Sequence, residues 1–269
     1  MDLSKKYRVK PGSKVNLSEW DPGDSGKFRS KDDVAEAVDA NTRRMADLQY
    51  LLYAEGKRAL LVVLQAMDAG GKDGVIRHVM GHLNPQGCAV ISFKVPTAEE
   101  LAHDFLWRIH KAVPAKGTIG VFNRSHYEDV LVVRVHNLAP KDVWSRRYEQ
   151  INEFERALAE GGVHLLKFYL YISPEEQLAR LKERIRDPRK HWKLNPADFE
   201  ERKFWGQYQQ AYEAALSGCS TEYAPWFIVP ADRKWYRDLV VSQIVADTLE
   251  SLGMKFPAPT CDVSKLKVK

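Results

Sequence analysis

The sequence predicts an α/β fold in which a five-stranded parallel sheet carries helices on both faces. Two observations support this prediction. Five short apolar runs alternate along the chain with amphipathic segments of helical spacing, which is the pattern of parallel strands joined by crossover helices. The 269 residues are enough to bury one sizeable core, and a composition with 44% hydrophobic and 29% charged residues is ordinary for a globular protein.

The first half of the chain is expected to hold an extended arm, a long helix and three strands. Residues 1–30 mix prolines and glycines with charges, which indicates an arm rather than a separate domain. Apolar positions recur every three or four residues from Lys31 to Glu55, and Gly56 is placed to end this helix. The other elements expected here are the Leu- and Val-rich strand after Arg58, helix Gly74–Leu83, strand Cys88–Phe93, helix Ala98–Val113 and strand Thr118–Phe122.

The second half continues the alternation and completes one domain over residues 31–255. Gly161 and Gly162 are placed to end a helix before a strand, and Ser173 followed by Pro174 is a strong helix start. The elements expected are helix Lys141–Glu160, strand Val163–Ile172, a helix from Ser173 towards Asp187, helix Phe199–Leu216, strand Trp226–Val229 and helix Trp235–Leu252. Residues 256–269 are expected to form an irregular tail.

A phosphate-binding loop is predicted where the first strand ends. The chain passes there from a buried strand through a glycine-bearing turn into a helical pattern, so backbone N–H groups and the positive end of a helix converge. The loop departs from the usual G-x-x-x-x-G-K-[S/T], with Ala66 at the first glycine and Asp73 at the metal-binding hydroxyl. The residues expected to contact phosphate are Ala69, Gly70, Gly71, Lys72, Asp73 and Gly74. The alternative is a plain strand-to-helix turn with an exposed lysine.

Asp68, inside this loop, is the predicted metal ligand. A carboxylate among phosphates would be repelled unless a divalent cation lay between them. We therefore expect Mg²⁺ as the cofactor, with Mn²⁺ as an alternative.

A second polar stretch, Asn123 to Asp129, follows the third predicted strand. Ligands of an open parallel sheet lie beyond the carboxyl ends of the strands, so Asn123 and Arg124 are expected to face the phosphate loop. Arg124 is suited to neutralise a transferring phosphoryl group, and Glu128 or Asp129 to complete the metal or nucleotide site. For these two acids, a surface cluster at the start of a helix is an equal alternative.

A run of basic residues predicts a lid. Arg180 and Arg184 stand four apart on one helix face, and Pro188 then breaks the helix. The run consists of Arg180, Lys182, Arg184, Arg186, Arg189, Lys190 and Lys193. By itself it would indicate a solvated face, but beside a phosphate loop it predicts a lid over residues 180–205 that contacts phosphates through guanidinium groups.

Three other signals are weaker. His78 and His82 have helical i, i+4 spacing without an H-E-x-x-H context, so structural or surface roles are expected. Nothing separates His126 from a packing residue. Arg108 follows the second predicted strand and is placed to meet an acceptor phosphate, with a structural role as the alternative.

The cysteine content and the net charge limit the class of protein to which this chain can belong. Three cysteines without C-x-x-C spacing indicate neither a disulfide framework nor a zinc site, and a reducing, cytoplasmic compartment is expected. No signal segment or membrane span is predicted. The net charge of +5 is mild, and no aromatic and basic interleaving indicates nucleic-acid binding.

Three motifs carry a resemblance to a known family. Gln65–Gly74, Phe122–Val132 and Val229–Arg237 resemble the polyphosphate kinase 2 family, especially its class III members, and the similarity extends from about Tyr7 to the tail. The resemblance implies a P-loop kinase-like three-layer fold with a helical basic lid. It also implies Mg²⁺-dependent transfer of the terminal phosphoryl group of inorganic polyphosphate to AMP and ADP, which forms ADP and ATP.

The same resemblance implies roles for individual residues. Asp68 and Asp129 are expected to bind metal, and Asn123 with Glu128 to set the preference for AMP or ADP. Many relatives carry Asp at the position of Asn123, so the Asn supports class III. The expected catalytic residues are Asp68, Lys72, Asn123, Arg124 and Glu128. The expected phosphate ligands include Lys72, Arg180, Arg184 and Lys193, and the expected nucleotide contacts are Arg108, Asn123, Glu128 and Arg134.

Two other functions stay open at the level of sequence. An ordinary nucleoside-monophosphate kinase would use the same loop and lid with ATP as donor, and a non-catalytic basic protein would bind nucleotides or RNA. A phosphate acceptor is already anionic, so the site needs cations more than a strong general base, and the basic residues agree with this demand. Self-association through the first long helix is expected to give a homo-oligomer.

Overall fold

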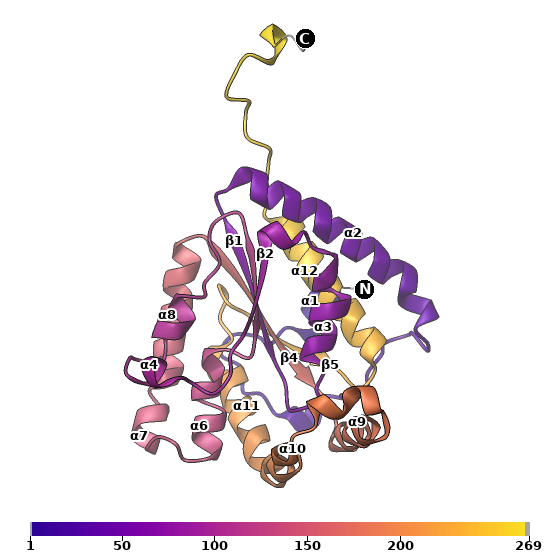
Figure 1. Ribbon diagram of the computed structural model, residues 1–269, viewed down its shortest axis with the longest axis vertical. Coiled ribbons are helices and arrows are strands. Elements are labelled where there is room, and N and C mark those ends of the chain that lie inside the picture. Colours follow the sequence, from indigo (N-terminus) through magenta and orange to yellow (C-terminus); the bar gives the residue numbers. More distant parts are fainter. Residues whose placement is uncertain (1, 267–269) are drawn as a thin grey trace.

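A single sheet lies at the centre of the computed structural model, in which residues 2–266 are described (Figure 1). Its strands are β1 (Ala59–Gln65), β2 (Cys88–Ser92), β3 (Ile119–Asn123), β4 (Val163–Tyr171) and β5 (Trp226–Pro230). They lie in the order β2-β3-β1-β4-β5, and each neighbouring pair is parallel. The predicted α/β fold with five parallel strands is confirmed.

Strand β1 shows why the sheet is covered on both faces. All of its residues are buried, and successive side chains of a strand point to opposite faces. Leu60, Val62 and Leu64 accordingly belong to one apolar cluster, whereas Leu61 and Val63 belong to another. A strand buried on both sides requires helices above and below it.

Helices α2 (Asp32–Glu55) and α12 (Lys234–Ser251) pack together on one face, and α8 (Arg147–Glu160) and α11 (Trp205–Cys219) cover the other (Figure 1). The predicted apolar stripe of α2 is buried at Val34, Met45 and Leu52. Gly56 ends this helix with a φ of 63° and donates its N–H to Leu52 O, as the sequence predicted.

The amino-terminal residues differ from the expected extended arm. They contain helix α1 (Leu3–Tyr7) and the 3₁₀ turn η1 (Leu17–Glu19). The Tyr7 hydroxyl lies 2.8 Å from that of Tyr236 on α12, and both side chains are buried. Arg8 then forms an antiparallel bridge to Phe227 on β5, and the N–H of Val9 donates to Trp226 O at 2.9 Å. These contacts, together with the buried side chains of Leu3, Val9 and Leu17, fix the segment against the body of the protein.

Three predicted helices are interrupted. The region 98–113 divides into α4 (Ala98–Leu101) and α5 (Trp107–His110), because the Asp104 carboxylate accepts the N–H of Leu106 at 2.9 Å and starts a new turn. The region 141–160 divides into α7 (Lys141–Trp144) and α8. The region 199–216 divides among α10 (Pro196–Glu201), the turn η6 (Arg202–Phe204) and α11.

The helix expected at Gly74–Leu83 is shorter and begins earlier. It runs as α3 (Lys72–His78) and is followed by the 3₁₀ turn η2 (Met80–His82). The early start follows from Gly71, whose φ of 105° lets the loop turn directly into the helix. After η2 the chain makes a further 3₁₀ turn, η3 (Pro85–Gly87), before β2.

The remaining elements carry the chain around the carboxyl ends of the strands. They are the turn η4 (His126–Asp129), α6 (Val132–Val135), α9 (Pro174–Arg186) and the turn η5 (Pro188–Lys193). Ser173 caps α9 as predicted, with its hydroxyl accepting the N–H of Glu176 at 3.1 Å. The tail extends away from the body and contains only the turn η7 (Val263–Lys265), while residues 267–269 of the predicted tail lie outside the described part (Figure 1). Among residues 2–266, no helix has the length and apolar character needed to cross a membrane.

Candidate active site

The phosphate loop turns sharply at the carboxyl end of β1. Its turn is closed by the N–H of Gly70, which donates to Met67 O at 3.0 Å, and Ala69 adopts a φ of 59°. A side chain at position 70 would place its Cβ only 2.5 Å from the Cβ of Ala66. The loop therefore requires glycine where the backbone doubles back, as the predicted phosphate cradle demands.

Lys72 lies at the start of α3 with its side chain folded into the loop. Its ammonium group donates to Ala66 O at 3.0 Å, and only 8% of the residue is exposed. Burial and the nearby charge of Arg124 lower the pKa of Lys72 to about 8. This desolvated ammonium group is poised to gain a phosphate oxygen as a partner.

Two buried arginines, Arg180 and Arg237, lie against the loop and line the cavity in front of it. Arg180 donates to Ala69 O at 2.9 Å and to Asp232 O at 3.0 Å. The guanidinium of Arg237 lies against the loop so closely that a Cβ at Gly71 would come within 2.1 Å of its Nη1. Arg180 was expected to hold phosphates, but its Nη atoms donate to backbone carbonyls here and its Nε donates to Glu176 at 2.8 Å. Arg237 lies in the family-like stretch Val229–Arg237, but no role was predicted for it.

Arg124 reaches the loop from the end of β3. Its φ of 65° is unusual for a residue with a side chain, and its N–H donates to Leu64 O at 3.1 Å. The guanidinium donates to Asp68 at 2.8 Å and to Glu128 at 3.3 Å. The structure thus brings together three of the predicted catalytic residues, Asp68, Arg124 and Glu128.

Asp73 joins the loop to two other elements. Its carboxylate accepts from Asn123 Nδ2 and from Lys193 Nζ, both at 3.1 Å. Partial burial raises the pKa of Asp73, but the contacts with Lys193 and Asn123 outweigh it and lower this pKa overall. Lys193, a residue of the predicted lid, therefore contacts the loop.

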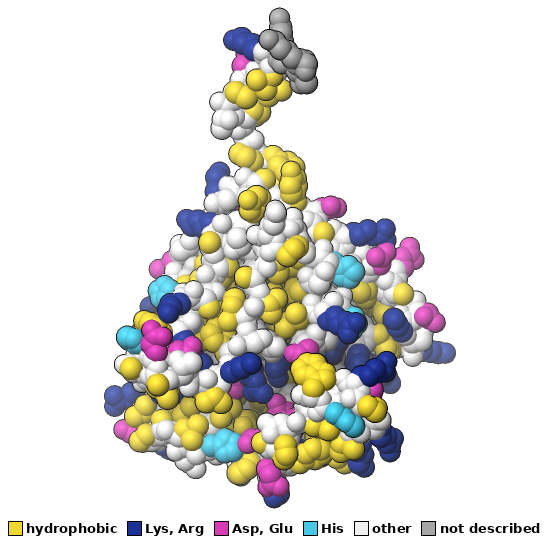
Figure 2. Space-filling view, viewed as in Figure 1, with side chains coloured by type: hydrophobic (Ala, Val, Ile, Leu, Met, Phe, Trp, Pro, Cys, Tyr) yellow, Lys and Arg dark blue, Asp and Glu magenta, His cyan; other side chains and the backbone are white. Residues whose placement is uncertain are grey.

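These elements enclose a cavity of about 870 Å³ between α2, the loop, α9, η5 and α12. Figure 2 shows Lys and Arg side chains gathered near α3 and α9, on the right of the molecule. The cationic side chains that line the cavity include Lys31, Arg77, Arg184, Lys190, Lys193 and Lys234. Of these, Arg184 is held by Asp198 of α10 at 3.1 Å. This group of cations makes the cavity suited to a polyanion.

A family model described as polyphosphate kinase 2 matches residues 28–257. The chain belongs to the polyphosphate kinase 2 family. It is 53% identical to the AMP/ADP-polyphosphate phosphotransferase of Meiothermus ruber over 266 residues, which cover 98% of this chain and 100% of that protein. It is 47% identical to the ADP-polyphosphate phosphotransferase of Rhodopseudomonas palustris, with 96% and 93% covered.

The solved structures agree with this assignment. The crystal structure of polyphosphate kinase 2 from Arthrobacter aurescens TC1 matches with a TM-score of 0.94 and 44% identity, over 98% of this chain and 94% of that one. The predicted family and its kinase fold are confirmed. The prediction that this chain is a polyphosphate-dependent phosphotransferase is confirmed at the level of the family.

Other predicted residues of this polyphosphate kinase lie outside the lining of the cavity. Asp129 is paired with Arg147 of α8 at 3.0 Å, and burial raises the pKa of Asp129 to about 6. Arg108 donates to Lys94 O at 2.9 Å, and Arg134 donates to the Tyr148 hydroxyl at 3.1 Å. Asp129 and Arg147 thus form an ion pair of their own, next to Glu128 along the chain. No motif in the sequence pointed to Arg147.

Few protein carboxylates in this kinase are placed to hold Mg²⁺. Among residues 2–266, no three His, Cys, Asp or Glu side chains are grouped to hold a metal ion. Mg²⁺ in kinases is usually held by one or two carboxylates together with substrate phosphates and water. Asp68 lines the cavity beside Lys72 and meets this requirement, whereas the expected second ligand, Asp129, faces Arg147.

Proposed function

We propose that this polyphosphate kinase transfers the terminal phosphoryl group of inorganic polyphosphate to AMP and then to ADP, forming ADP and ATP. The cavity carries this proposal, because it joins a phosphate loop to a lid whose cations line a space of about 870 Å³. The name of the 53% identical relative, an AMP/ADP-polyphosphate phosphotransferase, supports both acceptors. Asn123 at the end of β3 supports class III.

The reaction needs cations that reduce the repulsion between two anionic substrates more than it needs a general base. An oxygen of the acceptor phosphate attacks the terminal phosphorus of the donor, and the bond from that phosphorus to the bridging oxygen breaks, which leaves polyphosphate shorter by one unit. The attacking oxygen is already anionic. Lys72 and Arg124 supply positive charge where negative charge develops, and the loop amides orient the phosphates. Release of Arg124 from Asp68 would free its guanidinium for the transferred group.

Mg²⁺ is the proposed cofactor, with Mn²⁺ as an alternative. Asp68 would hold it, and Asp129 stays a prediction because it now pairs with Arg147. When bound, the cation would neutralise phosphate oxygens of the donor and acceptor.

The acceptor nucleotide is proposed to lie on the side of the loop where β3 ends. Asn123 and Glu128 flank Arg124 there, and Arg108 and Arg134 stay predicted nucleotide contacts. A cytoplasmic location, where these nucleotides are abundant, and self-association through α2 also belong to this proposal. No binding of nucleic acid and no insertion into membranes are proposed.

The test is an assay for ATP with AMP as acceptor, Mg²⁺, and polyphosphate as the sole donor. Wild type and Lys72→Ala are compared side by side, and circular dichroism checks that both are folded. ATP formed only by the wild type is the expected result. Conversion of ADP alone would remove AMP from the proposal, and a strict need for ATP as donor would replace it with an ordinary nucleoside-monophosphate kinase.

A further inference from the structure

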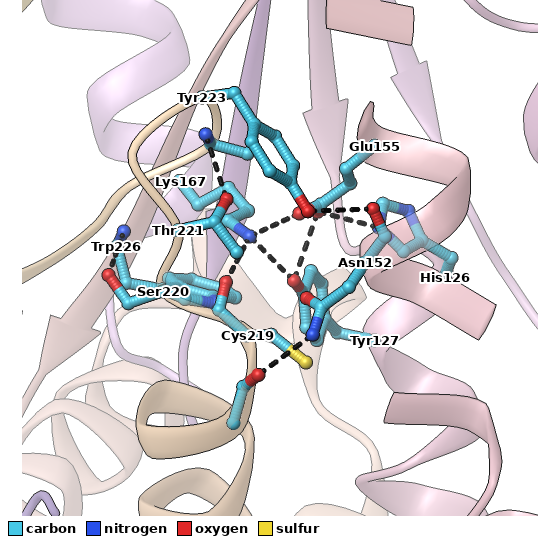
Figure 3. Close-up of polar contacts among 12 residues, drawn as sticks. His126, Tyr127, Asn152, Glu155, Lys167, Cys219, Ser220, Thr221, Tyr223 and Trp226 are labelled. Carbon is cyan, nitrogen blue, oxygen red and sulfur yellow. Dashed lines mark hydrogen bonds and ion pairs between the residues drawn. The ribbon is translucent and has the colours of Figure 1, made fainter. Parts of the chain in front are cut away.

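The turn that carries Arg124 has two faces with different partners. On the outer face, Arg124 and Glu128 lie against the phosphate loop through Asp68. On the inner face, His126 and Tyr127 point into the protein, and both are fully buried (Figure 3). The positive φ of Arg124 costs about 1 kcal/mol for a residue with a side chain, so the surrounding contacts must hold this conformation.

Both inner side chains end on one carboxylate (Figure 3). His126 Nε2 lies 3.1 Å from Glu155 Oε1, and the Tyr127 hydroxyl donates to the same oxygen at 3.0 Å. Glu155 belongs to α8 and is fully buried. Its other oxygen accepts from the ammonium group of Lys167. Glu155 therefore links the turn to a second charged residue inside the protein.

Lys167 uses all its hydrogen-bonding capacity inside this cluster. An ammonium group has three donors, and Lys167 Nζ contacts Glu155, the Tyr127 hydroxyl at 2.7 Å and Cys219 O at 2.6 Å. Cys219 O is at the end of α11, where a positive charge is favoured. Lys167 lies in β4 and pairs in register with Val63 of β1, the strand that leads into the phosphate loop. Four elements thus meet at one buried ion pair.

The charge states of the cluster favour a fixed arrangement. Burial lowers the pKa of His126, so the ring is neutral near pH 7 and its Nε2–H donates to Glu155. Burial alone would raise the pKa of Glu155, but the charge of Lys167 and the contact with His126 outweigh it and lower this pKa. An ionised Glu155 facing one ammonium group leaves no net charge.

Stability alone does not account for this ion pair. Buried pairs are costly to desolvate, and well-packed apolar replacements of similar volume are often neutral or stabilising. What an apolar cluster cannot supply is a directed set of hydrogen bonds to two side chains of the turn. We propose that Glu155 and Lys167 are positioning residues for phosphoryl transfer, which hold the turn so that Arg124 meets the loop. This inference rests on the proposed function.

The test uses an apolar replacement that retains folding. The variant Tyr127→Phe/Glu155→Leu/Lys167→Met removes the ion pair and the hydroxyl together, so no buried charge is left alone. We expect a folded variant with a moderately lower urea midpoint, because the Nε2–H of His126 loses its acceptor. We also expect kcat lower by at least tenfold and a KM for polyphosphate changed less than threefold. We also expect faster hydrogen exchange confined to residues 123–130. Tyr127→Phe alone keeps the ion pair and serves if the triple variant does not fold, with kcat expected about threefold lower.

A matched control lies at the opposite ends of the strands. Arg58 pairs with Glu55 at 3.0 Å and also donates to Leu252 O at 3.0 Å, so it resembles Lys167 in bridging a carboxylate and a helix end. Glu55→Leu/Arg58→Met removes that pair far from the loop. We expect kcat and exchange in the turn to match those of wild type.

A double-mutant cycle separates positioning from general damage. Arg124→Ala should lower kcat by a smaller factor in the triple variant than in wild type. In the triple variant Arg124 is already misplaced and contributes less to turnover. A folded triple variant with kcat within twofold of wild type, or losses that multiply in full, would overturn the inference. If wild type forms no ATP, the proposed function fails, while the exchange measurement still decides the inference: unchanged exchange in the turn overturns it, and loosening confined to the turn supports it.

Discussion

The ion pairs at the cavity and the ion pair behind it use the same residue types in different surroundings. In the pair Lys193–Asp73 the side chains are 33% and 67% exposed, whereas Lys167 and Glu155 are 0% exposed. In an exposed pair, water competes with the carboxylate for the cation, so a phosphate oxygen readily replaces that carboxylate. In a buried pair, neither water nor phosphate reaches the cation. The comparison teaches that exposure, more than charge, separates an ion pair that a phosphate oxygen can replace from an ion pair that holds geometry.

The largest effect is expected where the buried pair is broken on one side only. Lys167→Met leaves Glu155 as an uncompensated charge in the interior, so the free energy of unfolding should fall by about 3–5 kcal/mol. Urea unfolding followed by circular dichroism measures this loss. Lys203→Met, which removes the exposed pair Lys203–Glu200, is the control and should change stability by less than about 0.5 kcal/mol. A loss below about 1 kcal/mol in Lys167→Met would erase the contrast between the two regions.

The next effect falls on turnover rather than on stability. Lys72→Ala removes a desolvated cation from the loop, and kcat should fall by roughly 10²–10³, the scale for one preorganised electrostatic contact. Steady-state kinetics with AMP and polyphosphate provide the measurement. The variant should unfold no more easily than wild type, because a costly buried charge has gone. A decrease in kcat below about threefold would argue against the role of Lys72.

Deprotonation of Lys72 is expected to change activity and stability in opposite directions. As pH rises, kcat/KM for polyphosphate should fall, whereas the free energy of unfolding should increase. Its pKa of about 8 lies below the usual value, so the ammonium form is lost as pH rises through 8. We expect kcat/KM for polyphosphate to fall by about tenfold between pH 7 and pH 9. Over the range from pH 8 to pH 10 the unfolded chain binds more protons at this residue than the folded chain, so stability should rise through Lys72. In Lys72→Arg the loss of kcat/KM above pH 8 should disappear, and a wild-type profile flat to pH 9.5 would contradict the assignment.

The smallest effect is expected at the lid. Arg184→Ala should raise the KM for polyphosphate about fivefold, near 1 kcal/mol, because its guanidinium is partly exposed and one of several cations at the cavity. The change should be larger for short chains, and kcat should stay close to wild type. Initial rates over a series of polyphosphate lengths measure it. Unaltered donor kinetics would remove this lid residue from substrate binding.

The sequence predicted those parts of the site that lie close together along the chain. The loop from Ala66 to Gly74 and the stretch after β3 are local motifs, and the alternation of apolar runs was enough to predict the parallel sheet. Helix ends were less predictable. The region 98–113 has helical spacing throughout, yet the side chain of Asp104 competes for a backbone N–H and restarts the helix.

Residues that act across the fold could not be found from local patterns. Arg237 lies in the family-like stretch Val229–Arg237, but no local pattern placed it against Gly71. Arg147 pairs with Asp129 from α8, with α6 and α7 between them along the chain. One signal for the buried cluster was present. Lys167 is a charged residue in the middle of a mostly apolar predicted strand. A buried strand rarely tolerates a lysine without a partner.

The amino-terminal segment has a consequence for handling this protein. Strand β5 ends the sheet, and an uncovered edge strand presents unpaired N–H and C=O groups that can recruit another chain. Val9 covers part of this edge by donating to Trp226 O, and its own carbonyl accepts from Ser220. Removing residues 2–9 would uncover the edge and favour aggregation during expression, whereas an affinity tag on the tail beyond Phe256 would stand clear of both the sheet and the cavity.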